Sequence, residues 1–383
     1  MKKSSGWLVA IVFLLTIFLS LWFHSFRTRS VEAPPTIQRT VQKNPPKKPA
    51  STKRNIPKET NQTFEPLTLA ELRHMNRPGT LPRLIYLPDA DRGEVFRSLR
   101  RQGLPLWISD RFFLLPRHIK PGWVRLKRPI SLREFFEKIN DFPRERTRRV
   151  VMYSGDSLDD FVRHFSRQTR LRPRAIFDEY FRFSPYLEGG ILAGYYRLPY
   201  RLSAGPAMAY LTGESEKVFA RLARKYLGEY DPAGFKRYLI VASIVQRETW
   251  HPEEMPRIAS VIYNRLERGM KLQMDATLNY GPYSHRTVTP ERIRSDSSRF
   301  NTYRYKGLPP EPLGSVTRDA LVAALHPAKS SDLYFVRNLS GTHDFAPDYA
   351  THLANINRIK AERSRRKHSR KTGKSVKAEE SSK

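Results

Sequence analysis

An uncharged, mainly apolar run opens the chain, from Gly6 to Phe23 (GWLVAIVFLLTIFLSLWF). It is long enough to cross a bilayer as a single helix. Lys2 and Lys3 precede it, and the bulky residues at its end make a poor signal-peptide cleavage site, which favours a retained anchor over a cleaved leader. We therefore expect residues 1–26 to form a short cytoplasmic stub and a transmembrane helix, with the bulk of the chain exported.

Two polar segments flank the part of the chain that has a patterned core. Residues 27–68 are rich in Pro, Lys, Thr, Asn and Gln and have few apolar positions, as is typical of a flexible linker. Residues 361–383 carry many Lys and Arg and few Glu, which predicts a disordered basic tail. The composition leaves open whether this tail is passive or binds an anionic polymer or acidic lipid.

Residues 69–200 contain a weak internal repeat. It predicts two strand–helix–strand units, namely strand 84–88, helix 94–99 and strand 121–126, and then strand 150–153, helix 157–162 and strand 193–198. In the second unit Ser157 and Asp160 have the spacing of a helix capping box. The segment Gly155–Leu158, between strand and helix, resembles the opening of a LysM module. Such modules bind polymers that contain N-acetylglucosamine, and a generic strand–helix turn is the alternative interpretation.

Residues 201–360 contain longer segments in which apolar residues follow helical spacing. We expect helices over 203–226, 236–249 and 254–268, followed by short strands and turns at 271–275, 300–305 and 333–336. This mixture predicts an α+β domain after the smaller units. The fold class expected for the chain is therefore α+β, with an N-terminal transmembrane helix, LysM-like αβ units and a mixed α+β catalytic domain.

One position in the second of these helices breaks the apolar pattern. Val241, Ile244, Val245 and Glu248 follow the i, i+3, i+4, i+7 spacing of a buried stripe. A buried carboxylate is usually paired, protonated or functional. The alternative is that Glu248 reaches solvent at a frayed helix end.

Composition excludes several classes of site. Cysteine is absent, which removes disulfides and thiolate metal sites, and no zinc-protease helix, phosphate loop or esterase elbow is present. We expect no metal and no cofactor. The formal net charge of +32 indicates an anionic partner, but the expected export of the chain argues against nucleic acid.

The remaining candidates for chemistry are acids, amides and aromatic rings. Carboxylates move protons at glycosidic oxygens, amides bond to hydroxyl and acetamido groups, and rings pack on sugar faces. The set therefore indicates a sugar site, and its members are Glu248, Asn264, Gln273, Asp275, Tyr280, Asn301 and Tyr303.

These residues lie in motifs that resemble, in order, those of the YceG-like endolytic murein transglycosylases. The matching segments span about 187–352 and are VASIVQRET at 241–249, ASVIYNRL at 259–266, LQMDATLNYG at 272–281, NTY at 301–303, GLPP at 307–310 and YFV at 334–336 with His343 and Phe345. Two departures stand out. Gln246 occupies a position that is often acidic in the family, and the family's aspartate after Leu187–Gly189 is missing.

The resemblance implies cleavage of the β-1,4 bond between N-acetylmuramic acid and N-acetylglucosamine within glycan strands, which limits the length of nascent strands. The C6 hydroxyl of the substrate attacks C1 and leaves a 1,6-anhydro end, so Glu248 serves as acid and then as base. Asp275 could act as a second carboxylate, although a structural role is the stronger expectation. The substrate-binding residues implied are Gln273, Asp275, Asn264, Asn301, Tyr303 and Glu188.

The resemblance also implies a place for the protein in the cell. We expect a single-pass protein of the inner (cytoplasmic) membrane, with its catalytic domain on the outer side and cell-wall synthesis proteins as possible partners. Two alternatives stay open: a water-using muramidase, and a non-catalytic membrane-anchored scaffold that binds peptidoglycan.

Overall fold

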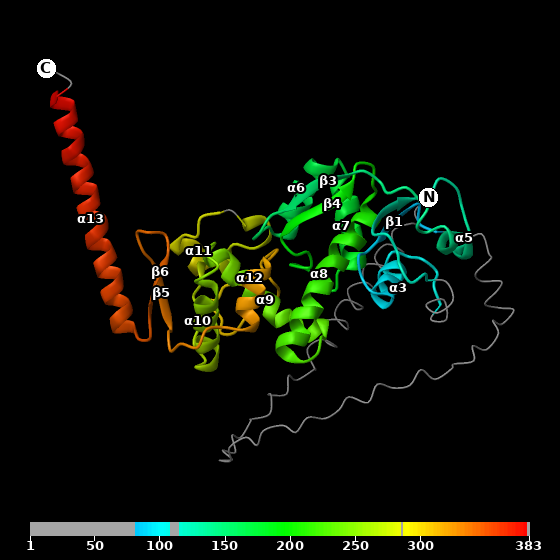
Figure 1. Cartoon of the computed structure of the whole chain (residues 1–383). Helices are drawn as coiled ribbons and strands as arrows, with labels where there is room; N and C mark the ends of the chain where they lie inside the picture. The colour runs from blue at the N-terminus through cyan, green and yellow to red at the C-terminus, as the bar shows by residue number, and fades with distance from the viewer. Residues whose placement is uncertain (1–80, 108–114, 285, 381–383) are drawn as a thin grey trace, which may run out of the picture. The chain divides into compact units, whose positions relative to one another are not determined.

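The computed structural model describes residues 81–107, 115–284 and 286–380 (Figure 1). The predicted anchor at 1–26 and the predicted linker at 27–68 lie outside these residues. None of the helices in the described ranges has the length and apolar character needed to span a membrane.

The described chain mixes helices with short strands, in agreement with the predicted α+β class (Figure 1). In chain order the elements are β1 (Leu84–Leu87), α3 (Arg92–Arg101), β2 (Gly122–Arg125), α5 (Leu132–Glu137), β3 (Thr147–Met152), α6 (Leu158–Thr169), α7 (Pro173–Phe183), β4 (Gly194–Pro199), α8 (Ala204–Leu227), α9 (Pro232–Glu248), α10 (Met255–Glu267), the 3₁₀ turns η1 (Asp275–Leu278) and η2 (Gly281–Tyr283), α11 (Pro290–Ser295), α12 (Arg318–Leu325), β5 (Tyr334–Arg337), β6 (His343–Ala346) and α13 (Tyr349–Glu380).

Each of the two predicted strand–helix–strand units closes a two-stranded antiparallel sheet. In the first, β1 pairs with β2 so that Leu84 lies opposite Arg125. In the second, β3 pairs with β4 so that Val150 lies opposite Tyr196. The predicted strand pairs are present, but the second unit has two helices, α6 and α7, between its strands where the sequence predicted one.

The predicted N-cap of the second unit, with an acidic residue at N3, is present. Ser157 is the N-cap of α6, and its hydroxyl oxygen accepts a hydrogen bond from the backbone N–H of Asp160. The same hydroxyl donates to the Asp160 carboxylate at 2.8 Å. The first of these bonds satisfies a backbone donor that a helix start leaves unpaired, and so helps to fix where α6 begins.

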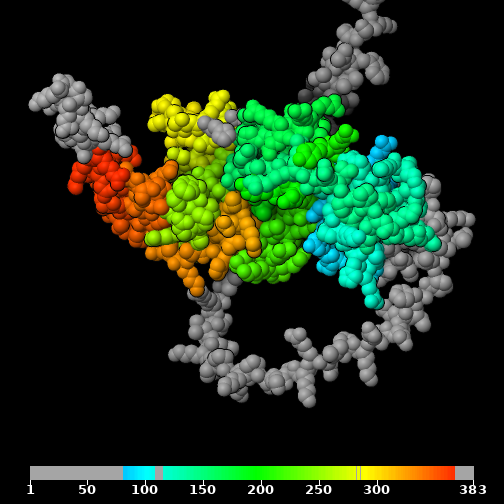
Figure 2. Space-filling model, turned by 45° about the horizontal axis from the view of Figure 1, so that its top comes forward, coloured from blue at the N-terminus to red at the C-terminus, as the bar shows by residue number. Residues whose placement is uncertain are grey.

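Helix α8 belongs to two hydrophobic cores. Ala207 and Leu211 in its first half pack with β3, α6 and α7, whereas Phe219 and Leu222 in its second half pack with α9, α10 and α12. It also contacts β1, α3 and α12. In Figure 2 the light-blue segment of β1 and α3 and the orange segment of α12 both border the green segment that contains it. Packing is therefore continuous across the predicted boundary at residues 200/201.

Of the segments predicted to form short strands and turns, 271–275 and 300–305 form loops and turns, because hydrogen bonds such as Met274 N–H to Thr302 Oγ1 tie them together without a ladder. The C-terminal tail departs from the sequence prediction. The tail predicted to be disordered from residue 361 is helical as far as Glu380. Ala, Glu, Lys and Arg are good helix formers, and here they extend a helix that starts beside β5 and β6.

Candidate active site

Glu248 is the last residue of α9, and the helix stops there for a local reason. Thr249 adopts an extended conformation as the C-cap, and its N–H still bonds to the carbonyl of Val245. The carboxylate does not fray into solvent as the alternative interpretation held. Its Oε1 atom is shielded from water and has no hydrogen-bond partner within the described part of the chain.

The Glu248 carboxyl group meets a small open cavity of about 170 Å³. Phe335 of β5 supplies an apolar wall. The side chains that bear charge or polar groups toward this space are Glu248, Arg265, Gln273, Asp275 and Tyr303. Asp275 and Gln273 are exposed, so the cavity opens on their side.

Asp275 begins the 3₁₀ turn η1, directly across from Tyr303. The Tyr303 hydroxyl donates a hydrogen bond of 2.6 Å to Asp275 Oδ1. This bond couples the two motifs in which the residues lie. Burial, followed by the hydrogen bond and charge of Asp275, raises the pKa of Tyr303, so its hydroxyl remains a proton donor at neutral pH.

Gln273 and Arg265 form the opposite side of the cavity. Gln273 has a positive φ of 54°, which is uncommon for a residue other than glycine and is found at constrained sites. Its side-chain oxygen accepts from Arg265 Nη1 at 3.2 Å. The guanidinium is buried and also donates to the carbonyls of Leu272 and Leu333, so it stands as a fixed cation.

Arg265 and Phe335 were not among the residues predicted for the site. The signal for Arg265 was available: Ile258, Ile262 and Arg265 follow the same stripe spacing that revealed Glu248. Phe335 lies in one of the matching motifs, but an aromatic residue in a strand reads as core from the sequence alone.

The pKa of Glu248 is raised from 4.5 to about 7. Burial is the largest cause, because it penalises the ionised form. The negative charge of Asp275 adds to the effect, whereas the backbone N–H of Ala276 opposes it by hydrogen bonding. At neutral pH the group therefore exchanges its proton readily in either direction, as a catalytic acid and base must.

Two of the predicted substrate-binding amides instead hold the backbone. Asn264 donates to the carbonyls of Ser330 and Asp332 at 2.9 and 2.8 Å. Asn301 is fully buried and donates to the carbonyls of Ile293 and Asp296, both at 2.8 Å. Neither side chain lines the cavity. Tyr280 also lies apart, stacked on Phe300 with ring centroids 4.0 Å apart.

Glu188 and Gln246 likewise lie away from the cavity. Glu188 accepts a hydrogen bond of 2.8 Å from the backbone N–H of Leu158, at the start of α6. Gln246 accepts from the N–H and hydroxyl of Thr317, at the start of α12. The structure thus brings Glu248, Gln273, Asp275 and Tyr303 together and leaves Glu188, Asn264 and Asn301 outside.

A network of hydrogen bonds lies just after Glu248 in the chain and centres on Glu254. Glu254 accepts from the Thr249 hydroxyl at 3.1 Å and from the backbone N–H of His343 at 2.6 Å, and its Oε2 lies 3.1 Å from His343 Nδ1. These bonds tie the end of α9 to β6. Among the described residues, no group of three or more His, Asp or Glu side chains is placed to hold a metal ion.

A known protein family matches the part of the chain that contains this cavity. The model of the YceG-like family matches residues 88–358. The chain belongs to the YceG-like family. The matched range includes every residue that lines the Glu248 cavity.

Individual relatives match over shorter stretches. A protein of Bacillus subtilis named endolytic murein transglycosylase is 34% identical over 116 residues, which are 30% of this chain and 32% of the relative. A Streptococcus pneumoniae protein of the same name is 33% identical over 124 residues, 31% of this chain and 22% of the relative. The matched segment thus spans a third or less of these relatives. A crystal structure of a YceG-like protein from Listeria monocytogenes has a TM-score of 0.49 and 21% identity, covering 71% of this chain and 98% of its own.

Proposed function

We propose that this YceG-like protein is an endolytic peptidoglycan lytic transglycosylase. The observation that carries the proposal is the shielded carboxyl of Glu248, with a pKa raised to about 7, in an open cavity beside Asp275. The relatives named endolytic murein transglycosylase support the choice of substrate. The bond cleaved would be the β-1,4 bond between N-acetylmuramic acid and N-acetylglucosamine.

The proposed reaction uses one carboxyl group twice. Protonated Glu248 gives its proton to the glycosidic oxygen as the bond from that oxygen to C1 breaks. The C6 hydroxyl of the same muramic acid then bonds to C1, and the Glu248 carboxylate takes the hydroxyl proton. A 1,6-anhydro end forms, water is not consumed, and Glu248 returns to its protonated state, so a second catalytic carboxylate is not required.

The neighbours of Glu248 have roles that follow from their geometry. Asp275 keeps the pKa of Glu248 high by its charge, and Tyr303 fixes Asp275 by its hydrogen bond. Gln273 offers an amide at the open side of the cavity, suited to sugar hydroxyl or acetamido groups. We assign Arg265 to binding an oxygen of the substrate, because its cation lines the cavity and is held by backbone carbonyls.

The nature of the product tests this proposal. Isolated sacculi are digested with the full-length protein, and the released fragments and shortened strands are examined by mass spectrometry. We expect 1,6-anhydro ends within strands. Ordinary reducing ends would show instead that the protein is a water-using muramidase, with Asp275 as its second carboxylate. Binding to sacculi with no cleavage at any protein concentration would indicate that the protein is a non-catalytic scaffold.

The pH dependence of the reaction should shift when the negative charge of Asp275 is removed. Because Glu248 must be protonated to act as acid, kcat/KM should fall as the pH rises through about 7. Asp275→Asn removes a negative charge that disfavours ionisation of Glu248, so the pKa of Glu248 falls and this alkaline limb moves to lower pH. Tyr303→Phe, which leaves the charge in place, serves as the comparison. An unmoved limb in Asp275→Asn would refute the electrostatic role.

We further propose the setting that the N-terminal sequence suggests. The apolar run at 6–23 would anchor the protein by a single pass in the cytoplasmic membrane, with the catalytic domain on the outer side. The units at 69–200 would bind glycan as LysM-like modules, and cell-wall synthesis proteins would be partners in limiting strand length. Extraction of the protein from membranes by detergent but not by high salt tests the anchor.

A further inference from the structure

The cavity at Glu248 is not the largest in the described part of the chain. A cleft of about 580 Å³ lies among the end of β1, the start of α3 and the middle of α8, and it shares no lining residue with the Glu248 cavity. Its volume is within the range of ligand-binding sites. Its walls are mostly charged, unlike those of a typical sugar site.

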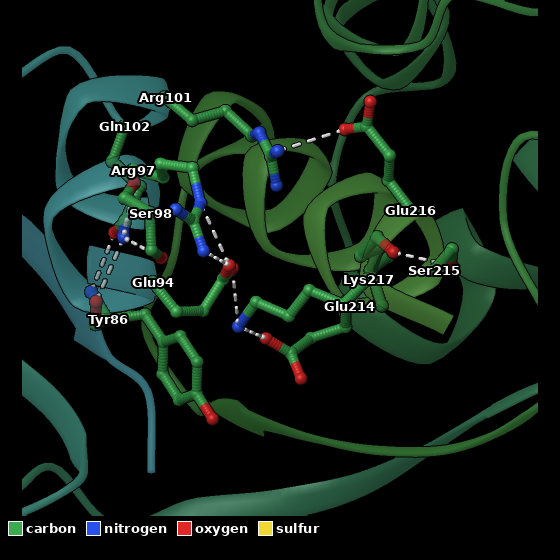
Figure 3. A network of polar contacts seen from close by, with 11 residues as sticks. Tyr86, Glu94, Arg97, Ser98, Arg101, Gln102, Glu214, Ser215, Glu216 and Lys217 are labelled. Carbon is green, nitrogen blue, oxygen red and sulfur yellow. Dashed lines mark hydrogen bonds and ion pairs between the residues drawn. The ribbon is translucent and has the colours of Figure 1, made fainter. Parts of the chain in front are cut away.

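Ion pairs tie together the charges on one side of this cleft (Figure 3). Glu94 lies 2.8 Å from Arg97 and 3.6 Å from Lys217, and Lys217 lies 2.7 Å from Glu214. The series alternates in sign and joins α3 to α8. These groups therefore neutralise one another and hold the two helices in place, and they do not by themselves select a ligand.

Tyr86 gives the cleft a fixed aromatic edge. The side-chain amide of Gln102 bonds to both the N–H and the C=O of Tyr86, at 2.7 and 2.8 Å (Figure 3). The Tyr86 ring packs edge-on against Tyr210, with centroids 4.4 Å apart. Burial, and then the charge of Glu214, raises the pKa of Tyr86 to about 12, so its hydroxyl remains protonated.

Three charged groups of the lining have no such compensation. Arg221 and Arg224 are exposed on one face of α8, three residues apart. Asp89 is exposed in the loop between β1 and α3. None of the three makes a hydrogen bond or an ion pair with any residue that the structure describes. A complementary ligand would carry carboxylate groups for the two guanidinium groups and an ammonium group for Asp89.

We propose that this cleft binds the peptide stem of peptidoglycan, a short peptide with free carboxylates and a free amine. This inference rests on the proposed function, which supplies a substrate that bears such stems. A sugar chain lacks the charges that the cleft would pair. A polyanion such as nucleic acid would meet the carboxylates of Glu94, Glu214 and Glu216 as well as the arginines.

Direct binding of a free stem tests the inference without any bond cleavage. Titration calorimetry at low ionic strength would use the full-length protein and the tetrapeptide L-Ala-D-Glu-diaminopimelate-D-Ala. Arg221→Gln/Arg224→Gln is expected to raise the Kd about tenfold, since two charge-assisted contacts are lost. Asp89→Asn should weaken binding of this peptide but not of a form acetylated on the diaminopimelate amine, which is the amine that stays free when the stem is joined to muramic acid. Salt should weaken the wild-type interaction.

The matched control is Arg167→Gln/Lys225→Gln, which removes the same charge from exposed positions on α6 and α8 outside the cleft. Its Kd should stay within about twofold of wild type, and thermal unfolding would verify that each variant folds. The inference is overturned if the wild-type protein does not bind the peptide, or if the two double variants bind the peptide with the same Kd. It is also overturned if a glycan oligosaccharide without peptide displaces the bound peptide. Failure of the proposed function would show separately, as intact sacculi in the presence of a protein that still binds the stem.

Discussion

Glu248→Gln is expected to reduce the rate of glycan cleavage about 10³-fold or more. Acid and base catalysis each contribute about 10²–10⁴-fold, and here a single group performs both. Glutamine keeps the size of the side chain, so the cavity and the substrate contacts stay in place, but it has no acidic proton to give. The measurement is the initial rate at which soluble fragments leave purified sacculi, with binding to sacculi followed in parallel.

Glu267→Gln provides the matched control. Glu267 ends α10 as Glu248 ends α9, but it is exposed and does not line the cavity. We expect this variant to cleave at the wild-type rate. If Glu248→Gln cleaved as fast as Glu267→Gln while both bound sacculi, another group would have to be the acid, and Asp275 would be the first to examine.

The position of Glu248 in the cavity was predictable because its signal is local. A carboxylate on an apolar stripe needs no knowledge of the tertiary structure, and the shielded Oε1 of Glu248 confirms that the stripe is buried at this point. The same rule applied to α10 would have found Arg265, which lies one turn beyond Ile262. It was missed because an arginine near a helix end is normally taken as solvated.

The amides show what the sequence cannot decide. Asn264 and Asn301 were predicted to bind substrate, yet their N–H groups are used by backbone carbonyls of residues that are close only in the folded chain. An amide has the same donors for either task, so only the positions of its acceptors distinguish the two. The sequence likewise left open whether 271–275 and 300–305 form strands or turns. Turns form there, since the hydroxyl groups of Thr302 and Thr277 bond to the backbone N–H and C=O of Met274.

Many elements of the fold were predictable, although α7 and α12 were not, and the packing was not predictable at all. The helix 203–226 was expected and is present as α8. The spacing of its apolar residues, however, could not show that the two halves of α8 pack into different hydrophobic cores. The charged cleft depends on this arrangement, because Lys217 and Arg221 of α8 line it together with residues of α3 only through the tertiary fold. Long-range contacts of this kind leave no mark on a local pattern.

The largest expected effect on stability concerns Glu188 and its dependence on pH. Burial raises the pKa of Glu188 from 4.5 to about 8, opposed by the hydrogen bond from the Leu158 N–H. Between these values the unfolded chain has released the proton and the folded protein keeps it. The stabilisation due to this group is therefore fully present below pH 4.5 and is lost as the pH rises through 8. The loss amounts to about 4–5 kcal/mol in the free energy of unfolding.

Glu188→Gln should remove this part of the pH dependence, because the amide cannot ionise and its oxygen can still accept from Leu158. The free energy of unfolding in urea, measured at intervals from pH 5 to pH 8, should fall less steeply in the variant than in wild type. Glu137→Gln, at an exposed position of α5, should follow the wild-type curve, which separates the effect of burial from that of net charge. Parallel curves for Glu188→Gln and wild type would mean that Glu188 is ionised in the folded protein, with Arg247, whose charge favours ionisation of Glu188, as its counter-charge.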